Sequence, residues 1–209
     1  MKNPQDGDNQ FEWQTKSSYD SVLKTIGEFL VEIVKVVIIS LAIIIPVRYF
    51  LIQPFYVKGA SMEPSFHDHE YLIIDEISYR LNQPQRGDII IFRYPKDPSQ
   101  YFIKRIIGLS GETVKITNDK VYIKNNEHAD FVELDESEYL AGGVVTSNYG
   151  RSEYVLEADQ YFVMGDNREQ SLDSRRFGTV AKRLVIGKAW VRGWPFDKVT
   201  IFKAPAYNF

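Results

Sequence analysis

The feature that most constrains the fold is an apolar segment that covers residues 29–52. Its charge-free part, residues 36–47, is only twelve residues long, which suits a buried core helix or the apolar region of a signal peptide. The whole segment, however, reaches roughly the twenty residues that a membrane-spanning helix needs. It then includes Glu32 and Lys35 near one end and Arg48 near the other, where charged side chains can reach the interface.

The flanking sequence favours a permanent anchor over a cleaved signal peptide. The start of the chain is not basic, and no small-x-small site directly follows the apolar segment. We therefore predict a single transmembrane helix at 29–52 after a polar tail at 1–28, and we interpret residues 1–20, which include Pro4 and Gly7, as flexible. The positive-inside rule gives no orientation, because the basic residues are balanced across the segment: Lys16 and Lys24 before it, Arg48 and Lys58 after it.

The composition excludes several functional classes. With 209 residues and a hydrophobic content of 44%, the chain can bury one good core. A net charge of -3 argues against binding to nucleic acid through phosphate contacts, so we expect no nucleic-acid partner. Cysteine is absent, which excludes disulfides, thiolate metal sites and a cysteine nucleophile. We expect no cofactor and no metal, because the two histidines of HDH (67–69) have no third ligand nearby and suit an exposed polar turn equally well.

Residues 53–209 have the pattern of a mainly β domain. Short runs of β-branched and aromatic residues alternate with Gly, Pro, Asn and Asp, which predicts antiparallel coiled sheets or a partly open barrel rather than a βαβ fold. TNDK (117–120) indicates a hairpin turn, and residues 127–150, acidic at first and then Gly- and Ser-bearing, indicate a long excursion from the core. The predicted strands are YLIIDE (71–76), DIIIFRY (88–94), YFIKRII (101–107), ETVKIT (112–117), KVYIKN (120–125), QYFVMG (160–165), KAWVR (188–192) and KVTIF (198–202).

The stretch VKGASMEPSF (57–66) places Ser61 among turn-forming residues. Gly59 can adopt backbone angles closed to other residues, and Pro64 stiffens the exit from the turn. The stretch is either a simple turn between strands or a turn that presents a serine hydroxyl for attack. A serine hydroxyl is a weak nucleophile until a base takes its proton, and no histidine stands in an obvious position to do so.

Lys104 lies inside the predicted strand YFIKRIIG, with Phe102 and Ile106 on its own face. A lysine on an edge strand is commonly a guard against aggregation. In an apolar setting, however, burial lowers a lysine pKa by up to about 3–5 units from about 10.4. A neutral lysine can then serve as the base, since Ser–Lys is a known variant of the catalytic triad.

A third dense stretch, MGDNREQSLDSRRFG, covers residues 164–178. Its first polar residues suit a tight turn after a strand. The charges that follow predict either a solvated, salt-bridged turn or a loop that positions groups around a site. The charged residues are Asp166, Arg168, Asp173, Arg175 and Arg176.

Together and in this order, these stretches resemble the bacterial type I signal peptidases, also called leader peptidases. The resemblance covers most of residues 30–192, and the excursion at 127–150 has no counterpart in it. It implies a membrane-bound serine endopeptidase that removes N-terminal signal peptides from secreted preproteins after a small-x-small site. The matching stretches are the apolar segment, GASMEP (59–64), RGDIIIF (86–92), FIKRIIGLSGE (102–112) and GDNREQSLDSRRFG (165–178).

The resemblance also implies roles for individual residues. Ser61 corresponds to the nucleophile, Lys104 to the general base, and Ser171 to a serine that orients the lysine amine. Supporting residues would be Asp173 and Arg175, which brace the last loop, and Asp166, which pairs with Arg105. Candidates to line the substrate pockets, by position, are Phe55, Val57, Met62 and Ile103.

One position departs from part of this family. Some members carry a serine two residues before the nucleophile, and its hydroxyl helps to bind the oxyanion. Here that position is Gly59, so the Ser61 N–H is expected to donate, and the second donor stays open between the Gly59 backbone and water. Losing one well-placed donor costs roughly 10²–10³ in rate, so the question affects the expected activity.

The resemblance implies a cytoplasmic N-terminus and an extracytoplasmic catalytic domain that meets preproteins at the lipid bilayer. The residues between Arg48 and Ser61 extend at most about 40–45 Å, at about 3.3–3.6 Å each, so the serine stays near the membrane surface. Two alternatives remain: a self-cleaving Ser–Lys protease of the repressor type, and a catalytically inactive tethered β-domain that binds extended peptides. The anchor counts against the first, and the joint presence of Ser61, Lys104 and Ser171 counts against the second.

Overall fold

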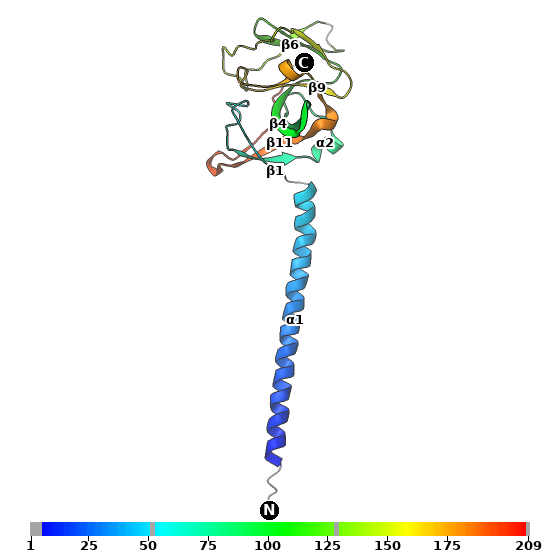
Figure 1. Cartoon of the computed structure of the whole chain (residues 1–209), viewed down its shortest axis with the longest axis vertical. Coiled ribbons are helices and arrows are strands. Elements are labelled where there is room, and N and C mark those ends of the chain that lie inside the picture. The colour runs from blue at the N-terminus through cyan, green and yellow to red at the C-terminus, as the bar shows by residue number, and fades with distance from the viewer. Residues whose placement is uncertain (1–5, 51–52, 128–129, 208–209) are drawn as a thin grey trace, which may run out of the picture. The chain divides into compact units, whose positions relative to one another are not determined.

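The computed structural model describes residues 6–50, 53–127 and 130–207 (Figure 1). The chain divides into two compact units, one of residues 1–48 and one of residues 49–209. The first is a helix and the second is built from β-strands.

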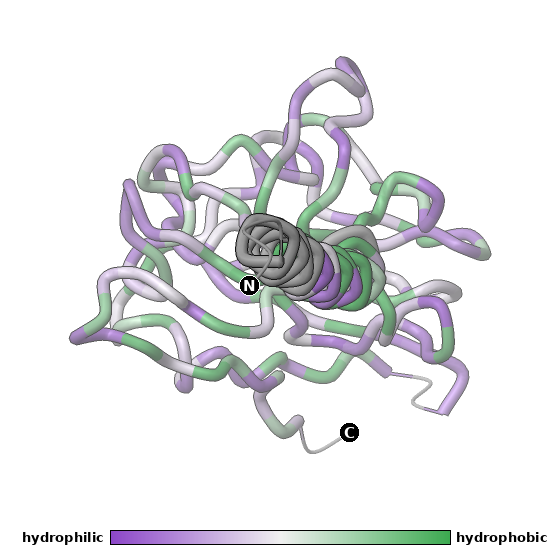
Figure 2. The backbone as a smooth tube through the Cα atoms, turned by 90° about the horizontal axis from the view of Figure 1, so that it is seen from below, coloured by the Kyte–Doolittle hydropathy of each residue, from purple (hydrophilic) through white to green (hydrophobic). Residues whose placement is uncertain are grey.

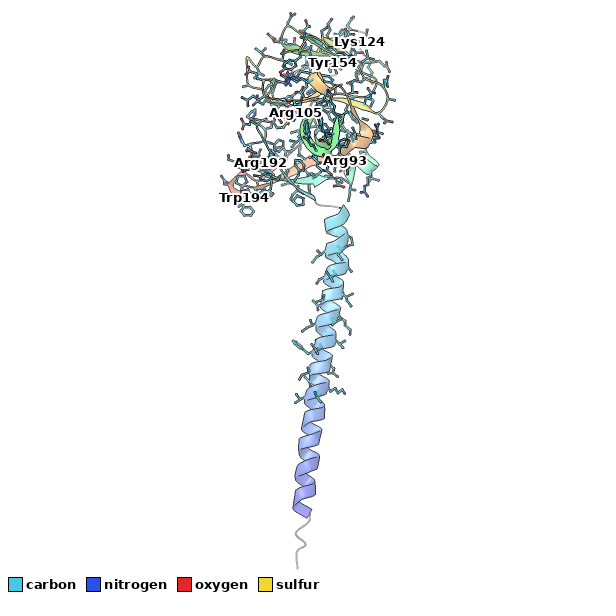
Figure 3. All side chains as sticks on the ribbon, in the orientation of Figure 1. Arg93, Arg105, Lys124, Tyr154, Arg192 and Trp194 are labelled. Carbon is cyan, nitrogen blue, oxygen red and sulfur yellow. The ribbon has the colours of Figure 1, made fainter. Side chains whose placement is uncertain are left out.

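The helix α1 runs from Asp6 to Phe50. Its part Val22–Pro46 has 25 residues and a mean hydropathy of 2.6, so it is long and apolar enough to cross a membrane. At about 1.5 Å per residue this part is roughly 37 Å long, more than the roughly 30 Å of a bilayer core. Its side chains project on all sides and nearly all are exposed (Figure 3), as expected for a helix that has no protein partner within its own unit.

The prediction of a flexible segment over residues 1–20 was wrong for the part that the structure describes, because α1 already begins at Asp6. Nucleation is the costly step of helix formation, whereas extension of an existing helix adds one hydrogen bond per ordered residue. The apolar segment therefore nucleates a helix that continues into the polar residues before it.

The β-rich unit contains a large antiparallel sheet with the strand order β1-β2-β11-β3-β4-β9-β10, and β12 pairs with β11. This order is an open path from β1 to β10, so the described strands form no closed barrel. The mainly antiparallel β class is confirmed. The strands are β1 (Gln53–Tyr56), β2 (Tyr71–Asp75), β3 (Ile89–Tyr94), β4 (Asp97–Gly108), β9 (Gln160–Met164), β10 (Val180–Ala181), β11 (Val185–Trp194) and β12 (Thr200–Ile201).

A second sheet has the order β7-β6-β5-β8 and is also antiparallel. Its central hairpin turns at Asn118 and Asp119, whose φ angles of 49° and 62° match the predicted turn. The strands are β5 (Thr113–Thr117), β6 (Lys120–Lys124), β7 (Val132–Glu133) and β8 (Glu153–Val155). The short helices of the unit are α2 (Ser78–Leu81) and α3 (Ser174–Phe177), with 3-10 turns η1 (Lys182–Leu184) and η2 (Phe196–Lys198).

Alternation of side chains along the strands builds the core. Buried and more exposed residues alternate in β5 and β6. Figure 2 shows hydrophilic and hydrophobic stretches interspersed along the backbone of the β-rich unit. One apolar cluster includes Met62 and Phe66, one and five residues after Ser61, which are almost fully buried against residues of β2, β3 and β4. Burial of each such side chain contributes roughly 1.5–3 kcal/mol, so the core fixes the turn that carries Ser61.

Candidate active site

Ser61 lies in a loop between β1 and β2 that is closed by backbone hydrogen bonds. The Val57 N–H donates to Glu70 O at 2.8 Å, and the His69 N–H donates to Val57 O at 3.1 Å. Within the loop, Gly59 has a φ of 88°, which a residue with a side chain rarely adopts. The hydrogen bonds beside the sheet and the backbone conformation of Gly59 together fix the turn that carries Ser61.

Lys104 lies on β4, and its amine reaches the Ser61 hydroxyl across 43 residues of sequence. Lys104 Nζ lies 2.7 Å from Ser61 Oγ and donates a second hydrogen bond, also 2.7 Å long, to Ile103 O. In the sheet, Lys104 is opposite Ile90 of the central strand β3, so its position is set by the most buried part of the domain. The structure therefore brings together the two residues that the sequence predicts as a catalytic pair.

The Lys104 side chain is buried, with an exposed fraction of 4% for the residue. Burial lowers the pKa of the Lys104 amine to about 8, and the charges of Asp173 and Asp166 limit that lowering. A lysine with this pKa is partly neutral near neutral pH, and its free electron pair can then accept a proton from Ser61.

The loop at 165–175 contacts the two backbone carbonyls on either side of the Ser61 Cα. The Asn167 N–H donates to Ser61 O at 3.1 Å, and Asn167 Nδ2 donates to Ala60 O at 3.1 Å. Gly165 is wedged between Ser61 and Ser171, since a Cβ added to Gly165 would lie 2.3 Å from both Ser61 O and Ser171 Oγ. Sequence reasoning treated Asn167 only as a turn residue. Its place directly after Gly165 and Asp166 suits a tight turn and gave no sign of this long-range contact.

Both predicted ion pairs around the site are present and buried. Arg105 donates to Asp166 from Nε at 2.8 Å and from Nη2 at 2.7 Å. Arg175 donates to Asp173 from Nε at 2.9 Å and from Nη2 at 2.8 Å, and Asp173 also accepts the Gly165 N–H at 3.1 Å. Asp173 thus links the ion pair directly to the glycine beside Ser61.

Ser171 is buried next to Gly165, and its hydroxyl has no hydrogen-bond partner within the part of the chain that the structure describes. The two hydrogen bonds of the Lys104 amine go to Ser61 and Ile103. The sequence prediction that Ser171 orients Lys104 is therefore not represented by a direct hydrogen bond in this conformation, and it stays a prediction.

A cleft of about 520 Å³ opens beside Ser61 and Lys104. Two of the predicted pocket residues, Phe55 and Ile103, line it. The other two, Val57 and Met62, do not line this cleft. They are almost fully buried in an apolar cluster of the core, with exposed fractions of 1% each. Residues that sequence reasoning did not propose also line the cleft: Tyr56, Gln100, Tyr101, Phe102, Gln170 and Leu172.

The Gly59 N–H is not available to bind an oxyanion in this structure, because it donates to Asp68 Oδ1 at 2.9 Å. This hydrogen bond is the main reason why the pKa of the Asp68 carboxyl lies below its ordinary value. The Ser61 N–H, by contrast, meets no acceptor among the described residues. Of the two backbone donors considered from the sequence, the Ser61 N–H is the one that is free.

The comparisons with known proteins agree with this arrangement. Residues 30–194 match the family described as "Signal peptidase, peptidase S26". The chain is similar to a probable signal peptidase I-2 of Synechocystis sp., 36% identical over 173 residues that cover 80% of this chain and 75% of that protein. It is also 34% identical over 173 residues to a signal peptidase I of Bacillus licheniformis, covering 81% of this chain and 91% of that protein.

A signal peptidase I of Leptolyngbya laminosa is 35% identical over 177 residues, which cover 81% of this chain and 82% of that protein. The matched region extends from the apolar helix to the end of β11 and includes every stretch around Ser61 and Lys104. The chain therefore belongs to the signal peptidase I family, peptidase S26, and is a serine peptidase that removes signal peptides from preproteins.

Proposed function

We propose that Ser61 is the nucleophile and Lys104 the general base of signal-peptide removal in this chain. The observation that carries the proposal is the 2.7 Å separation of Lys104 Nζ and Ser61 Oγ in a buried setting. Nucleophile and base within hydrogen-bond distance, with the base pKa near the working pH, are the two requirements for an activated serine.

The reaction then follows from the geometry. Neutral Lys104 takes the Ser61 proton while Oγ attacks the carbonyl carbon of the last signal-peptide residue, and the Ser61 N–H donates to the oxyanion that forms. The resulting Lys104 ammonium gives its proton to the leaving amine of the mature protein, which breaks the peptide bond and leaves an ester on Ser61. Lys104, neutral again, takes a proton from a water molecule whose oxygen attacks the ester carbonyl carbon. Lys104 then returns this proton to Ser61 Oγ as the ester bond breaks and the signal peptide leaves as a carboxylic acid.

Ser171 has a supporting role in this proposal. Its hydroxyl is buried beside Gly165 and lacks a partner among the described residues, and a buried hydroxyl without a hydrogen bond is costly. In this proposal the Lys104 amine takes the Ser171 hydroxyl as a further partner during proton transfer. The ion pairs Asp173–Arg175 and Asp166–Arg105 fix the loop from which Ser171 projects.

The substrate is proposed to bind in an extended conformation with small residues, typically alanine, at positions −3 and −1 before the cleaved bond. Within the described sheet, β1 pairs only with β2, so its other edge is free to pair with an added strand. Phe55 on β1 and Ile103 on β4 line the cleft and would limit the volume of the −1 and −3 side chains.

We further propose that α1 spans the lipid bilayer with the N-terminus in the cytoplasm and the catalytic domain outside. Support comes from the length and mean hydropathy of Val22–Pro46 and from the place where preproteins emerge. The catalytic serine then lies on the outer side of the membrane, where the cleavage site at the end of the signal peptide emerges.

Sealed membrane vesicles test substrate and topology in one assay. Right-side-out vesicles should cleave an added purified preprotein with alanine at −3 and −1 without detergent, whereas inverted vesicles should need detergent. Mass spectrometry of the product N-terminus should place the cut directly after the −1 residue. Leucine at −1 should lower kcat/KM by more than about tenfold, since the pocket excludes extra methylene groups.

Matched vesicles that carry Ser61→Ala report cleavage by any host enzyme, which is subtracted. Cleavage by sealed inverted vesicles would show the reverse orientation. Equal cleavage of the leucine substrate would contradict the small-residue rule, without bearing on the orientation.

A further inference from the structure

The excursion at 127–150 has no counterpart among the matching motifs, yet its described part contacts the catalytic loop through buried side chains. Its contacts converge on three arginines. Glu136 and Thr146 contact Arg168, and Tyr139 packs on Arg105. The carbonyl of Ser147 accepts a hydrogen bond from Arg175 Nη1 at 3.3 Å, and the Tyr149 ring lies 5.2 Å from the same guanidinium.

The Arg168 side chain has no exposed surface. Arg168 Nη1 donates to Glu136 Oε2 at 3.0 Å and to Thr146 Oγ1 at 2.8 Å, and Nη2 forms an ion pair with Glu136 Oε1. On its other side, Arg168 Nε donates to Gly165 O at 3.1 Å. Arg168 therefore connects the excursion to the glycine that is wedged between Ser61 and Ser171.

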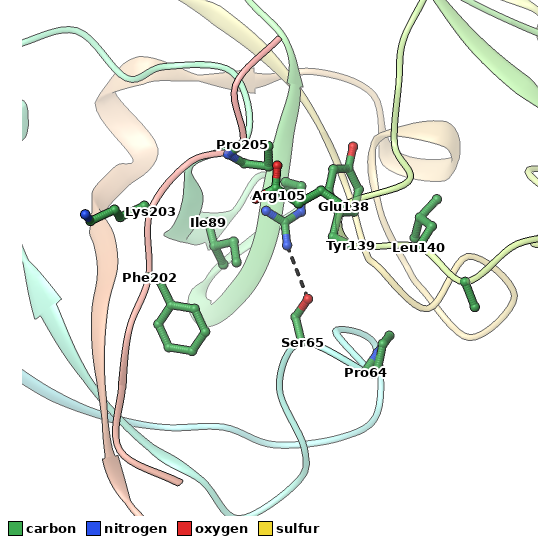
Figure 4. A pocket seen from close by; sticks show the side chains of 11 residues that line it. Pro64, Ser65, Ile89, Arg105, Glu138, Tyr139, Leu140, Phe202, Lys203 and Pro205 are labelled. Atoms are coloured by element: carbon green, nitrogen blue, oxygen red, sulfur yellow. Dashed lines mark hydrogen bonds between the residues drawn. The ribbon is translucent and has the colours of Figure 1, made fainter.

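The excursion reaches the Ser61 loop by a second route. Tyr139 Oη donates to Glu136 Oε1 at 2.8 Å, and the Tyr139 ring lies 4.0 Å from the Arg105 guanidinium. Arg105 Nη2 in turn donates to Ser65 Oγ at 3.2 Å, and both residues line a cavity of about 440 Å³ (Figure 4). Glu136 thus lies at the start of two chains of contacts that approach the turn after Ser61 from different sides.

Charge balance makes Glu136 the necessary partner of Arg168. Glu169, the next residue in sequence, is exposed, and the two buried carboxylates of the same loop are already paired, Asp166 with Arg105 and Asp173 with Arg175. A buried guanidinium that loses its only carboxylate leaves an uncompensated charge, which is strongly unfavourable. Without Glu136, Arg168 would either move toward water or compete for Asp166 or Asp173, and each change would shift the backbone at Gly165.

We propose that Glu136 is a positioning residue for signal-peptide cleavage: through Arg168 and the Gly165 carbonyl, it fixes the loop that packs against Ser61 and Ser171. The inference rests on the proposed roles of Ser61 and Lys104. The proposal gives the excursion at 127–150 a role in catalysis, although it lies between the family motifs and contains none of them.

The test is Glu136→Gln in the full-length enzyme in detergent, assayed on a preprotein with alanine at −3 and −1. We expect kcat to fall by about 10–100-fold with KM within about twofold, because a small displacement of catalytic groups affects the transition state more than peptide binding. The matched control is Glu133→Gln, which removes the exposed ion pair between Lys120 and Glu133, 2.6 Å long, in the same segment. This control should keep the kcat of the unchanged enzyme.

Thr146→Val, which keeps the shape of the side chain and removes one acceptor of Arg168, provides a milder variant if Glu136→Gln does not fold. Its kcat should fall severalfold with KM unchanged. Where Glu136→Gln folds, adding Thr146→Val to it should have a smaller effect still, because both changes act on Arg168. Each variant is compared at a temperature well below its own unfolding midpoint, measured by circular dichroism.

A Glu136→Gln enzyme with a lowered unfolding midpoint but the kcat of the Glu133→Gln control would show that the contact is only structural, and would overturn the inference. A Glu136→Gln enzyme in which only KM changes, with kcat equal to that of the control, would overturn the inference as well. These outcomes are distinguishable from failure of the proposed function, which would appear as undiminished cleavage by Ser61→Ala in the same preparation.

Discussion

Replacement of Lys104 by methionine is expected to lower the kcat of signal-peptide cleavage by at least about 10⁴-fold, and Ser61→Ala should have an effect of similar size. Methionine keeps the length and apolar contacts of the buried lysine but cannot accept a proton. The proposed pair, supported by the 2.7 Å separation of the Lys104 amine and the Ser61 hydroxyl, requires both residues, so the loss of either should remove the same step. Cleavage of a purified preprotein by each variant, measured over hours at high enzyme concentration, gives both rates.

Two controls make this result interpretable. Circular dichroism should show the same β-sheet signal in both variants, since one changes a side chain of similar shape and the other removes a single oxygen. The Ser61→Ala/Lys104→Met double variant should be no slower than either single variant, because residues that act as one unit are not additive. A Lys104→Met enzyme within about tenfold of the unchanged rate would remove Lys104 from the mechanism.

Gly165→Ala should reduce kcat by about 10²-fold or more, although residue 165 has no reacting atom. An added Cβ would lie 2.3 Å from Ser61 O and from Ser171 Oγ, so at least one of the two serines must move. A displacement of about 1 Å in a catalytic group can cost about 10²-fold in rate, and overpacking of a core position costs about 1–3 kcal/mol of stability. Steady-state kinetics and a thermal unfolding curve measure the two effects separately.

The matched control for this variant is Gly142→Ala. A Cβ added at Gly142 meets no atom within 4 Å, and its backbone does not require glycine. The control should therefore keep both kcat and the unfolding midpoint. If Gly165→Ala retained the kcat of Gly142→Ala, close packing of the loop against Ser61 would have no part in catalysis.

Much of the fold could be predicted from local sequence patterns. Each of the predicted strand segments contains a strand. The signal for these strands is local, because it consists of short runs of β-branched and aromatic residues bounded by turn-forming residues such as Gly and Asn. The strands that were not predicted are β1, β7, β8 and β10, which have only two to four residues each. Such short strands are defined by pairing with a distant partner and leave no pattern of their own.

The candidate site could be predicted where a motif carries it and not where a long-range contact does. Ser61 and Lys104 each lie in a stretch that matches a family motif. Their proximity follows once β4, which carries Lys104, lies beside the β1–β2 loop, which carries Ser61. The pairing of Arg168 with Glu136 has no such sign, because the sequence offers many carboxylates and does not say which one a buried arginine meets. The hydrogen bond from Gly59 to Asp68 is equally hidden, since it depends on the closure of the loop by Val57 and Glu70.

The central claim, that a neutral buried lysine takes the proton of Ser61, is tested most directly by the pH dependence of kcat/KM for cleavage of the preprotein. The pKa of Lys104 is lowered to about 8, so the reactive neutral form predominates above that pH and is lost as the pH falls through it. We expect log kcat/KM to be level above about pH 9 and to fall by about one unit per pH unit below about pH 7. A flat profile from about pH 6 to about pH 9, with the enzyme folded throughout, would contradict the account.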